Sequence, residues 1–95
     1  MPDGSSDFMV RVAARFLKDA AISADAKVLR AVLGAFADGA TGYSYVLPST
    51  LDRVLGWGRS RREKAQRELV RGGWLRLGWR RGERARWARR VYFLP

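Results

Sequence analysis

The chain has 95 residues, 47% hydrophobic and 29% charged, which fits one globular domain with a modest core. It contains no cysteine and no histidine, which excludes disulfides, thiolate metal sites and the most common general base. No apolar run approaches the roughly 20 residues that span a bilayer, and residues 1–7 are too polar for a signal peptide. We therefore expect a cytoplasmic protein without a cofactor, a metal or a membrane partner.

The nineteen basic and nine acidic residues give a net charge of +10, and their distribution is uneven. Residues 1–50 hold five basic and five acidic side chains, which cancel, whereas residues 51–95 hold fourteen basic and four acidic ones. The whole excess therefore lies in the second half. This asymmetry indicates a polyanionic partner, with nucleic acid as the first candidate and an anionic membrane surface as the second.

The N-terminal part predicts a flexible tail followed by a short strand. Residues 1–7 contain Pro, Gly and Ser and no large apolar side chain except the initial Met, which is typical of a loose tail. Phe8, Val10 and Val12 then alternate with other residues, and this period of two predicts a strand. We expect a single folded domain over residues 8–95.

Two helical segments are predicted next. Residues 13–18 fit one helical turn that buries Phe16 and Leu17. A longer helix begins after Ser23, which suits the N-cap position, and is expected to end near Asp38, before two glycines. Its apolar residues recur with helical spacing at Leu29, Val32, Leu33 and Phe36.

A pair of helices joined by a tight turn follows. The first begins at residues 48–50, with Ser49 or Thr50 as its cap, and ends at Gly56. The second covers residues 59–71 and is ended by two glycines. A sharp connection of three or four residues that contains glycine is what a helix-turn-helix requires. The apolar face of the first helix is predicted to be Leu51, Val54 and Leu55.

The last part of the chain predicts a hairpin rich in arginine. Residues 74–80 and 87–94 alternate in polarity, as strands do, around a turn at residues 81–84. In the second strand, Val91 and Phe93 share one face and Arg90 and Tyr92 the other. Eight arginines and no lysine occur between residues 71 and 90.

The stretch from Ser49 to Leu75 resembles the winged-helix family of bacterial and phage replication-initiation and regulatory proteins. In that family a helix ending in Leu-Gly, here Leu55 and Gly56, leads into a recognition helix that ends in Leu, a small residue and Gly. The resemblance covers residues 8–80 and implies an α+β winged helix-turn-helix: a three-helix core, a C-terminal hairpin wing and a short N-terminal strand. One departure is Arg62, where members usually carry an apolar residue.

The recognition helix and the wing supply the candidate DNA-binding residues. At 100° per residue, the side chains opposite Ala65 and Leu69 would face the major groove. Glu63 is expected to pair with Arg59 or Arg67 or, as the alternative, to accept from a cytosine. Arg62 and its neighbour are expected to cover the core edge with their stems and to extend their guanidinium groups to solvent. The candidates are Arg59, Ser60, Arg61, Lys64, Arg67 and Arg71 on the helix, and Arg80, Arg81, Arg84 and Arg86 near the wing tip.

Four tryptophans lie among these basic residues, and their positions allow two interpretations. Aromatic side chains between cations can stack on single-stranded bases, but three of the four fall where the hairpin must pack on the helices. We expect Trp74, Trp79 and Trp87 to belong to the core and Trp57, in the turn, to be partly exposed.

The sequence thus predicts a non-enzymatic protein that binds double-stranded DNA, as a transcriptional regulator or as a plasmid or phage replication or maintenance factor. No catalytic residues are recognised, because the few acids are dispersed among cations and no serine has a histidine base. A homodimer is a candidate state and would use the N-terminal segment or the hairpin. The alternatives are an RNA or single-strand binder, which exposed Trp79 and Trp87 would favour, and a protein-interaction adaptor.

Overall fold

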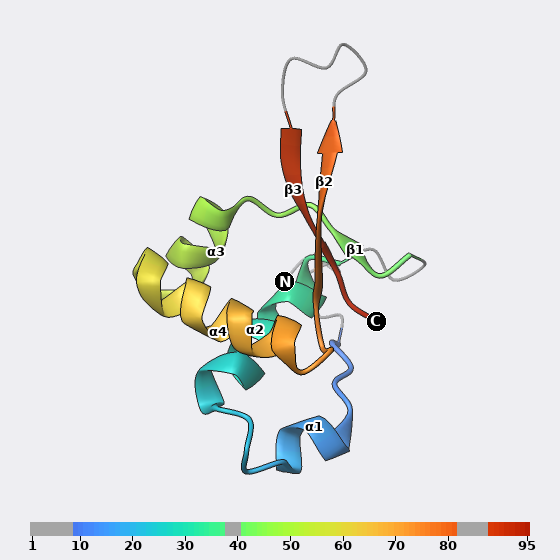
Figure 1. Cartoon of the computed structure of the whole chain (residues 1–95), viewed down its shortest axis with the longest axis vertical. Coiled ribbons are helices and arrows are strands. Elements are labelled where there is room, and N and C mark those ends of the chain that lie inside the picture. The colour runs from blue at the N-terminus through green and yellow to red at the C-terminus, as the bar shows by residue number, and fades with distance from the viewer. Residues whose placement is uncertain (1–8, 38–40, 82–87) are drawn as a thin grey trace, which may run out of the picture.

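The computed structural model describes residues 9–37, 41–81 and 88–95, with four helices and a three-stranded antiparallel sheet in these ranges. The α+β class expected from the sequence is confirmed. In Figure 1 the helices form one body, and the hairpin of β2 and β3 extends away from it. The sheet order is β1-β3-β2. The elements are α1 (Ala14–Lys18), α2 (Ala24–Ala35), β1 (Tyr43–Ser44), α3 (Pro48–Leu55), α4 (Arg59–Arg71), β2 (Arg76–Arg81) and β3 (Ala88–Phe93).

The N-terminal strand predicted at residues 8–12 is wrong for the described part of that segment. Residues 9–13 have an irregular backbone, and Val10 lies against α2, so close that a Cβ added at Gly34 would be 2.8 Å from its Cγ1. The strand beside β3 is β1 instead, with Tyr43 opposite Phe93. Because β2 pairs with the other edge of β3, both edges of β3 are taken by later parts of the chain.

The core lies where the helices meet the base of the hairpin. Its most buried side chains come from every helix and from both ends of the hairpin segment. α1 contributes Phe16 alone, and the predicted burial of Leu17 is wrong, because neighbouring residues of so short a helix point about 100° apart and Leu17 faces solvent. The buried cluster consists of Phe16, Ala26, Leu29, Leu33, Leu51, Ala65, Leu69, Leu75 and Tyr92.

Helix α2 begins as the sequence predicts. The hydroxyl of Ser23 accepts a hydrogen bond of 3.1 Å from the backbone N–H of Ala26, which is the expected cap. The helix ends at Ala35, earlier than the predicted end near Asp38. Phe36 is therefore the C-cap and is exposed, whereas the sequence placed it on the buried stripe.

Helix α3 begins with Pro48 after an N-cap Leu47, and no side chain caps it, so the cap predicted at Ser49 or Thr50 is wrong. Proline sets the helical φ of the first position and lacks the N–H that would need a partner. Val54, expected on the apolar face, is exposed. The predicted bounds of α4, and Gly56 as the end of α3, are confirmed.

Two glycines border the turn between α3 and α4, and only one of them needs to be glycine. Gly56 has a φ of 69°, in the left-handed region, whereas Gly58 is the extended N-cap of α4 with a φ of −80°. A Cβ at either position would meet no atom within 4 Å. Any difference between the two sites therefore comes from backbone conformation rather than from crowding.

The same substitution should have opposite effects at these two glycines. We expect Gly56→Ser to lower the free energy of unfolding by about 1 kcal/mol, the cost of a Cβ in a left-handed conformation. Gly58→Ser should leave it unchanged or raise it by a few tenths of a kcal/mol, because serine is a good N-cap. Urea unfolding of both variants measures this. Equal stabilities would contradict the assignment of the turn.

Candidate functional site

Helix α4 has one buried face and, opposite it, an exposed face that is mainly basic. Arg62, Ala65 and Leu69 are buried, and the opposite side is exposed, as the helical projection predicted. The cations there form no hydrogen bond or ion pair with any other described residue, although Lys64 and Arg71 contribute to the lowered pKa of Glu68, and Lys64 to that of Asp25. The exposed residues on this outward face are Ser60, Lys64, Arg67 and Arg71.

Arg59 lies at the start of α4 beside this face, and it is paired within the helix. Its Nε lies 3.5 Å from Oε1 of Glu63, one turn further on. This is one of the two intrahelical pairs expected from the sequence, and it is confirmed. Both side chains are exposed, so the pair stabilises the helix by only a few tenths of a kcal/mol.

Arg61 points away from the outward face, toward α2. Its Nε and Nη2 donate hydrogen bonds of 2.9 and 3.0 Å to the two carboxylate oxygens of Asp25. Its guanidinium carbon lies 4.6 Å from the centre of the Trp57 ring. The pKa of Asp25 is lowered by the hydrogen bond from Arg61. This candidate DNA contact therefore fastens α2, α4 and the turn together.

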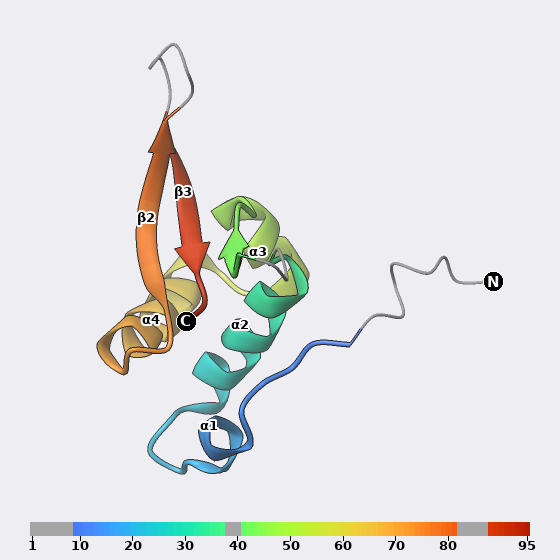
Figure 2. The same ribbon diagram turned by 90° about the vertical axis from the view of Figure 1, so that its right-hand side faces the viewer.

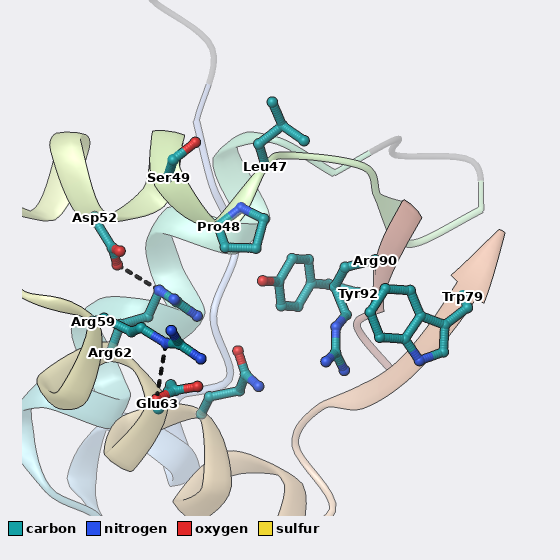
Figure 3. Close-up of a pocket in the computed structure, with 11 residues that line it drawn as sticks. Leu47, Pro48, Ser49, Asp52, Arg59, Arg62, Glu63, Trp79, Arg90 and Tyr92 are labelled. Atoms are coloured by element: carbon teal, nitrogen blue, oxygen red, sulfur yellow. Dashed lines mark hydrogen bonds and ion pairs between the residues drawn. The ribbon is translucent and has the colours of Figure 1, made fainter. Parts of the chain in front are cut away.

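Arg62 is buried, and the expectation that its guanidinium reaches solvent is wrong. The residue is only 6% exposed, and its Nε donates to Oδ1 of Asp52 on α3 (Figure 3). A guanidinium can remain charged in such a place because a carboxylate accepts from it. The departure from the winged-helix pattern thus corresponds to an ion pair between α3 and α4.

A second contact between α2 and α4 was not foreseen. The carboxylate of Glu68 accepts a 2.7 Å hydrogen bond from the backbone N–H of Ser23 and a 2.6 Å bond from its hydroxyl. These bonds lower the pKa of Glu68. In a capping box this acid would stand three residues after the cap, where α2 has Ala26. A serine cap without its acid was the only signal in the sequence.

The hairpin carries its aromatic and basic side chains on both faces. Arg90 lies 4.4 Å over the ring of Trp79, and Arg76 lies 5.7 Å over Phe93 on the opposite face. Trp79 is 65% exposed, so its predicted place in the core is wrong. Figure 2 shows the reason: the hairpin extends beyond the helices, which leaves its outer part nothing to pack against.

The burial predictions for the other three tryptophans have different outcomes. Trp74 is partly buried and packs edge to face on Phe16, with ring centroids 4.7 Å apart, which confirms its place at the core. Trp57 is partly exposed, as predicted. Trp87 lies outside the described residues. Two candidate DNA contacts, Arg84 and Arg86, also lie outside the described residues. For two others, Arg80 and Arg81, the structure describes the backbone but not the side chain.

A groove of about 500 Å³ separates the hairpin from α3 and α4. Figure 3 shows Tyr92 directed across it from the hairpin, toward Pro48 and the Arg62–Asp52 pair, whereas Arg90 runs beside Trp79. Tyr92 is 1% exposed, and its hydroxyl has no hydrogen-bond partner. The residues that line the groove are Leu47, Pro48, Ser49, Asp52, Arg59, Arg62, Glu63, Gln66, Trp79, Arg90 and Tyr92.

The described residues contain neither a candidate metal site nor a candidate membrane-spanning helix. Within residues 9–37, 41–81 and 88–95, no three acidic side chains come together in a way that could hold a metal ion. No helix in these ranges has the length and apolar character needed to cross a bilayer.

Comparison with known proteins gives one structural similarity. No protein-family model matches the chain, and no curated protein sequence is significantly similar to it. A solved structure described as the N-terminal domain of a DNA binding protein superposes with a TM-score of 0.66. The similarity covers 95% of this chain and 76% of the other, at 16% sequence identity. At this identity, the comparison concerns the fold.

The buried pair should matter far more to stability than the exposed one. Asp52→Ala leaves the Arg62 guanidinium buried without its acceptor, and we expect a loss of about 3 kcal/mol in the free energy of unfolding. The matched change Glu63→Ala removes an exposed partner and should cost less than about 0.5 kcal/mol. Thermal or urea unfolding gives both values. Comparable losses would show that the Arg62–Asp52 pair does not hold α3 against α4.

The contact between Glu68 and Ser23 predicts a dependence on pH. Because the folded-state pKa of Glu68 is lowered from 4.5, its contribution to stability is present above the unfolded-state pKa and is lost as the pH falls through the folded-state pKa. We expect Glu68→Gln to be less stable than the parent at pH 7 and to lose less stability upon acidification. Melting curves between about pH 6 and 3 measure this; parallel curves would contradict it.

Proposed function

We propose that this chain is a winged helix-turn-helix domain that binds double-stranded DNA, with α4 in the major groove and the β2–β3 hairpin as the wing. The observation that carries the proposal is the outward face of α4. Lys64, Arg67 and Arg71 are exposed there and form no hydrogen bond or ion pair with the other described residues. Arginine and lysine can donate to guanine O6 and N7 and can neutralise phosphates.

The arrangement around α4 supports the proposal. Helix α3 and helix α4 are joined through Gly56, Trp57 and Gly58, which is the short glycine-containing connection of a helix-turn-helix. The hairpin follows α4 directly and projects from the body (Figure 1), as a wing that contacts phosphates or the minor groove would. The similar solved structure is itself described as part of a DNA binding protein.

A role in transcription or in plasmid or phage replication or maintenance fits a domain of this kind, acting in the cytoplasm without catalysis. A homodimer formed through the N-terminal segment or the hairpin would place two α4 helices on a pseudo-palindromic site. Of the ten candidate contacts, the outward-face residues and Arg59 remain available to DNA. Arg61 serves the fold through Asp25. The wing arginines Arg80, Arg81, Arg84 and Arg86 are proposed from the sequence alone.

Exposure of Trp79 favours a second candidate function, the binding of RNA or single strands. An indole that is 65% exposed beside an arginine is a platform on which a base can stack. Duplex binding remains the main proposal, because Lys64, Arg67 and Arg71 share one exposed face of a helix that fits a major groove.

Binding to duplex DNA should depend strongly on salt. If about six phosphates are neutralised, a plot of log affinity against log salt concentration should have a slope of roughly −5. Fluorescence anisotropy with a labelled duplex between 50 and 300 mM salt provides the measurement. Absence of duplex binding at low salt would refute the proposal.

The effect of removing one cation on DNA affinity should depend on where that cation lies. Arg67→Ala should weaken binding to a sequence selected from random duplexes by about 1–3 kcal/mol and relax preference at one base pair. Arg11→Ala removes the same charge from the exposed segment before α1 and should change affinity little. Equal losses in a competition assay would show that net charge alone, and not the α4 face, drives binding.

A further inference from the structure

The groove between the hairpin and helices α3 and α4 has the size of a small-molecule site. Its volume of about 500 Å³ lies within the roughly 300–1,000 Å³ typical of ligand pockets. It lies to one side of the outward face of α4, because Arg59, Glu63 and Gln66 line it whereas Lys64, Arg67 and Arg71 do not. A ligand in this groove would therefore leave Lys64, Arg67 and Arg71 uncovered and would share only Arg59 with the candidate DNA contacts.

Tyr92 gives the groove a polar group that nothing in the protein satisfies. Its hydroxyl is buried, has no hydrogen-bond partner and points across the groove (Figure 3). Burial raises the pKa of Tyr92, so the hydroxyl stays neutral and keeps its proton. A buried hydroxyl without a partner destabilises the fold, and an acceptor on a ligand would remove that cost.

The hairpin wall offers a flat surface. Trp79 and Arg90 are opposite each other in the strand register, and the guanidinium lies 4.4 Å over the exposed indole. Arg90 has no acidic partner among the described residues. Nucleobases stack on aromatic rings and on guanidinium planes, so this pair is suited to a planar ring rather than to an aliphatic chain.

The opposite wall offers an anion site. Leu47, Pro48 and Ser49 line it, and α3 begins there without a side-chain cap. The backbone N–H groups of Ser49 and Thr50 form no hydrogen bond with the described residues, and such free amides at a helix N-terminus bind phosphate. Arg59 lines the same groove together with its ion-pair partner Glu63, so the lining cation without an acidic partner among the described residues is Arg90.

We propose that this groove binds a single nucleotide, with its base against Trp79 and Arg90 and its phosphate at the N-terminus of α3. The hydroxyl of Tyr92, which is covered in the unbound groove, donates a hydrogen bond to an oxygen or ring nitrogen of that nucleotide once the side chains that cover it shift. A free mononucleotide and an unpaired nucleotide in bound DNA share this chemistry; the second source rests on the proposed DNA-binding function.

The experiment compares three probes on the full chain: a fully paired labelled duplex, the same duplex with one bulged adenosine, and free AMP. If the nucleotide belongs to bound DNA, the bulged duplex should bind about tenfold more tightly, as base stacking provides. If the nucleotide is free, AMP should bind on its own and the two duplexes should bind equally.

Variants test whether the nucleotide detected in either case binds in the groove. Trp79→Ala should abolish whichever of the two is observed, the preference for the bulge or the binding of AMP. Arg90→Ala should weaken that same preference or binding severalfold. The matched control Arg76→Ala removes the arginine that lies over Phe93 on the other face of the hairpin and should leave both unchanged. Tyr92→Phe should weaken nucleotide binding while thermal stability stays the same or rises, because the lost hydroxyl has no internal partner.

Two results would overturn the inference. Equal affinity for both duplexes without AMP binding would remove the nucleotide site and leave duplex binding intact. A bulge preference or AMP binding that persists in Trp79→Ala would place the nucleotide outside the groove. Failure of both duplexes to bind would instead refute the proposed DNA-binding function, and AMP binding that Trp79→Ala abolishes would still establish the groove.

Discussion

The direction of α4 depends on the ion pair between Arg62 and Asp52. A guanidinium that is 6% exposed loses most of its hydration, and only a well-placed acceptor makes this tolerable. Asp52 supplies that acceptor from α3, and its backbone carbonyl also accepts from the Trp57 N–H as the chain leaves that helix. One residue of α3 thus fixes both the end of its own helix and the orientation of the next.

Two further carboxylates hold the other side of α4. Asp25 accepts from Arg61, and Glu68 accepts from Ser23 at the start of α2. Together with Asp52, they place the acidic groups on the sides of α4 that contact other helices. The cations that remain unpaired are consequently those that face outward. The positive surface is therefore a product of which acids the fold uses, in addition to the net charge.

Local signals in the sequence were sufficient for the helices of the second half but not for packing. The glycines at 56 and 72 and the helical period between them predicted the bounds of α4 correctly. The prediction of an N-terminal strand was wrong because alternation at Val10 and Val12 shows only that one side of the segment is buried. In the structure, Val10 of this segment lies against α2. The predicted burial of Trp79 was wrong because the length by which a hairpin projects from the helices depends on tertiary structure. The partners of Arg62 and Glu68 are 10 and 45 residues away, beyond any local pattern.

The two basic regions of the molecule differ in what they can distinguish. Unpaired cations on an exposed helix face attract any polyanion, and salt screens that attraction. The groove beside them combines one unsatisfied buried hydroxyl, uncapped amides and a stacked Trp79–Arg90 pair. These groups stabilise only a bound ligand whose own groups match their positions. Buried polar groups left unpaired penalise the wrong ligand more than they stabilise the right one. In the proposed function, affinity comes mainly from the outward face of α4, and selectivity for an unpaired nucleotide comes from the groove.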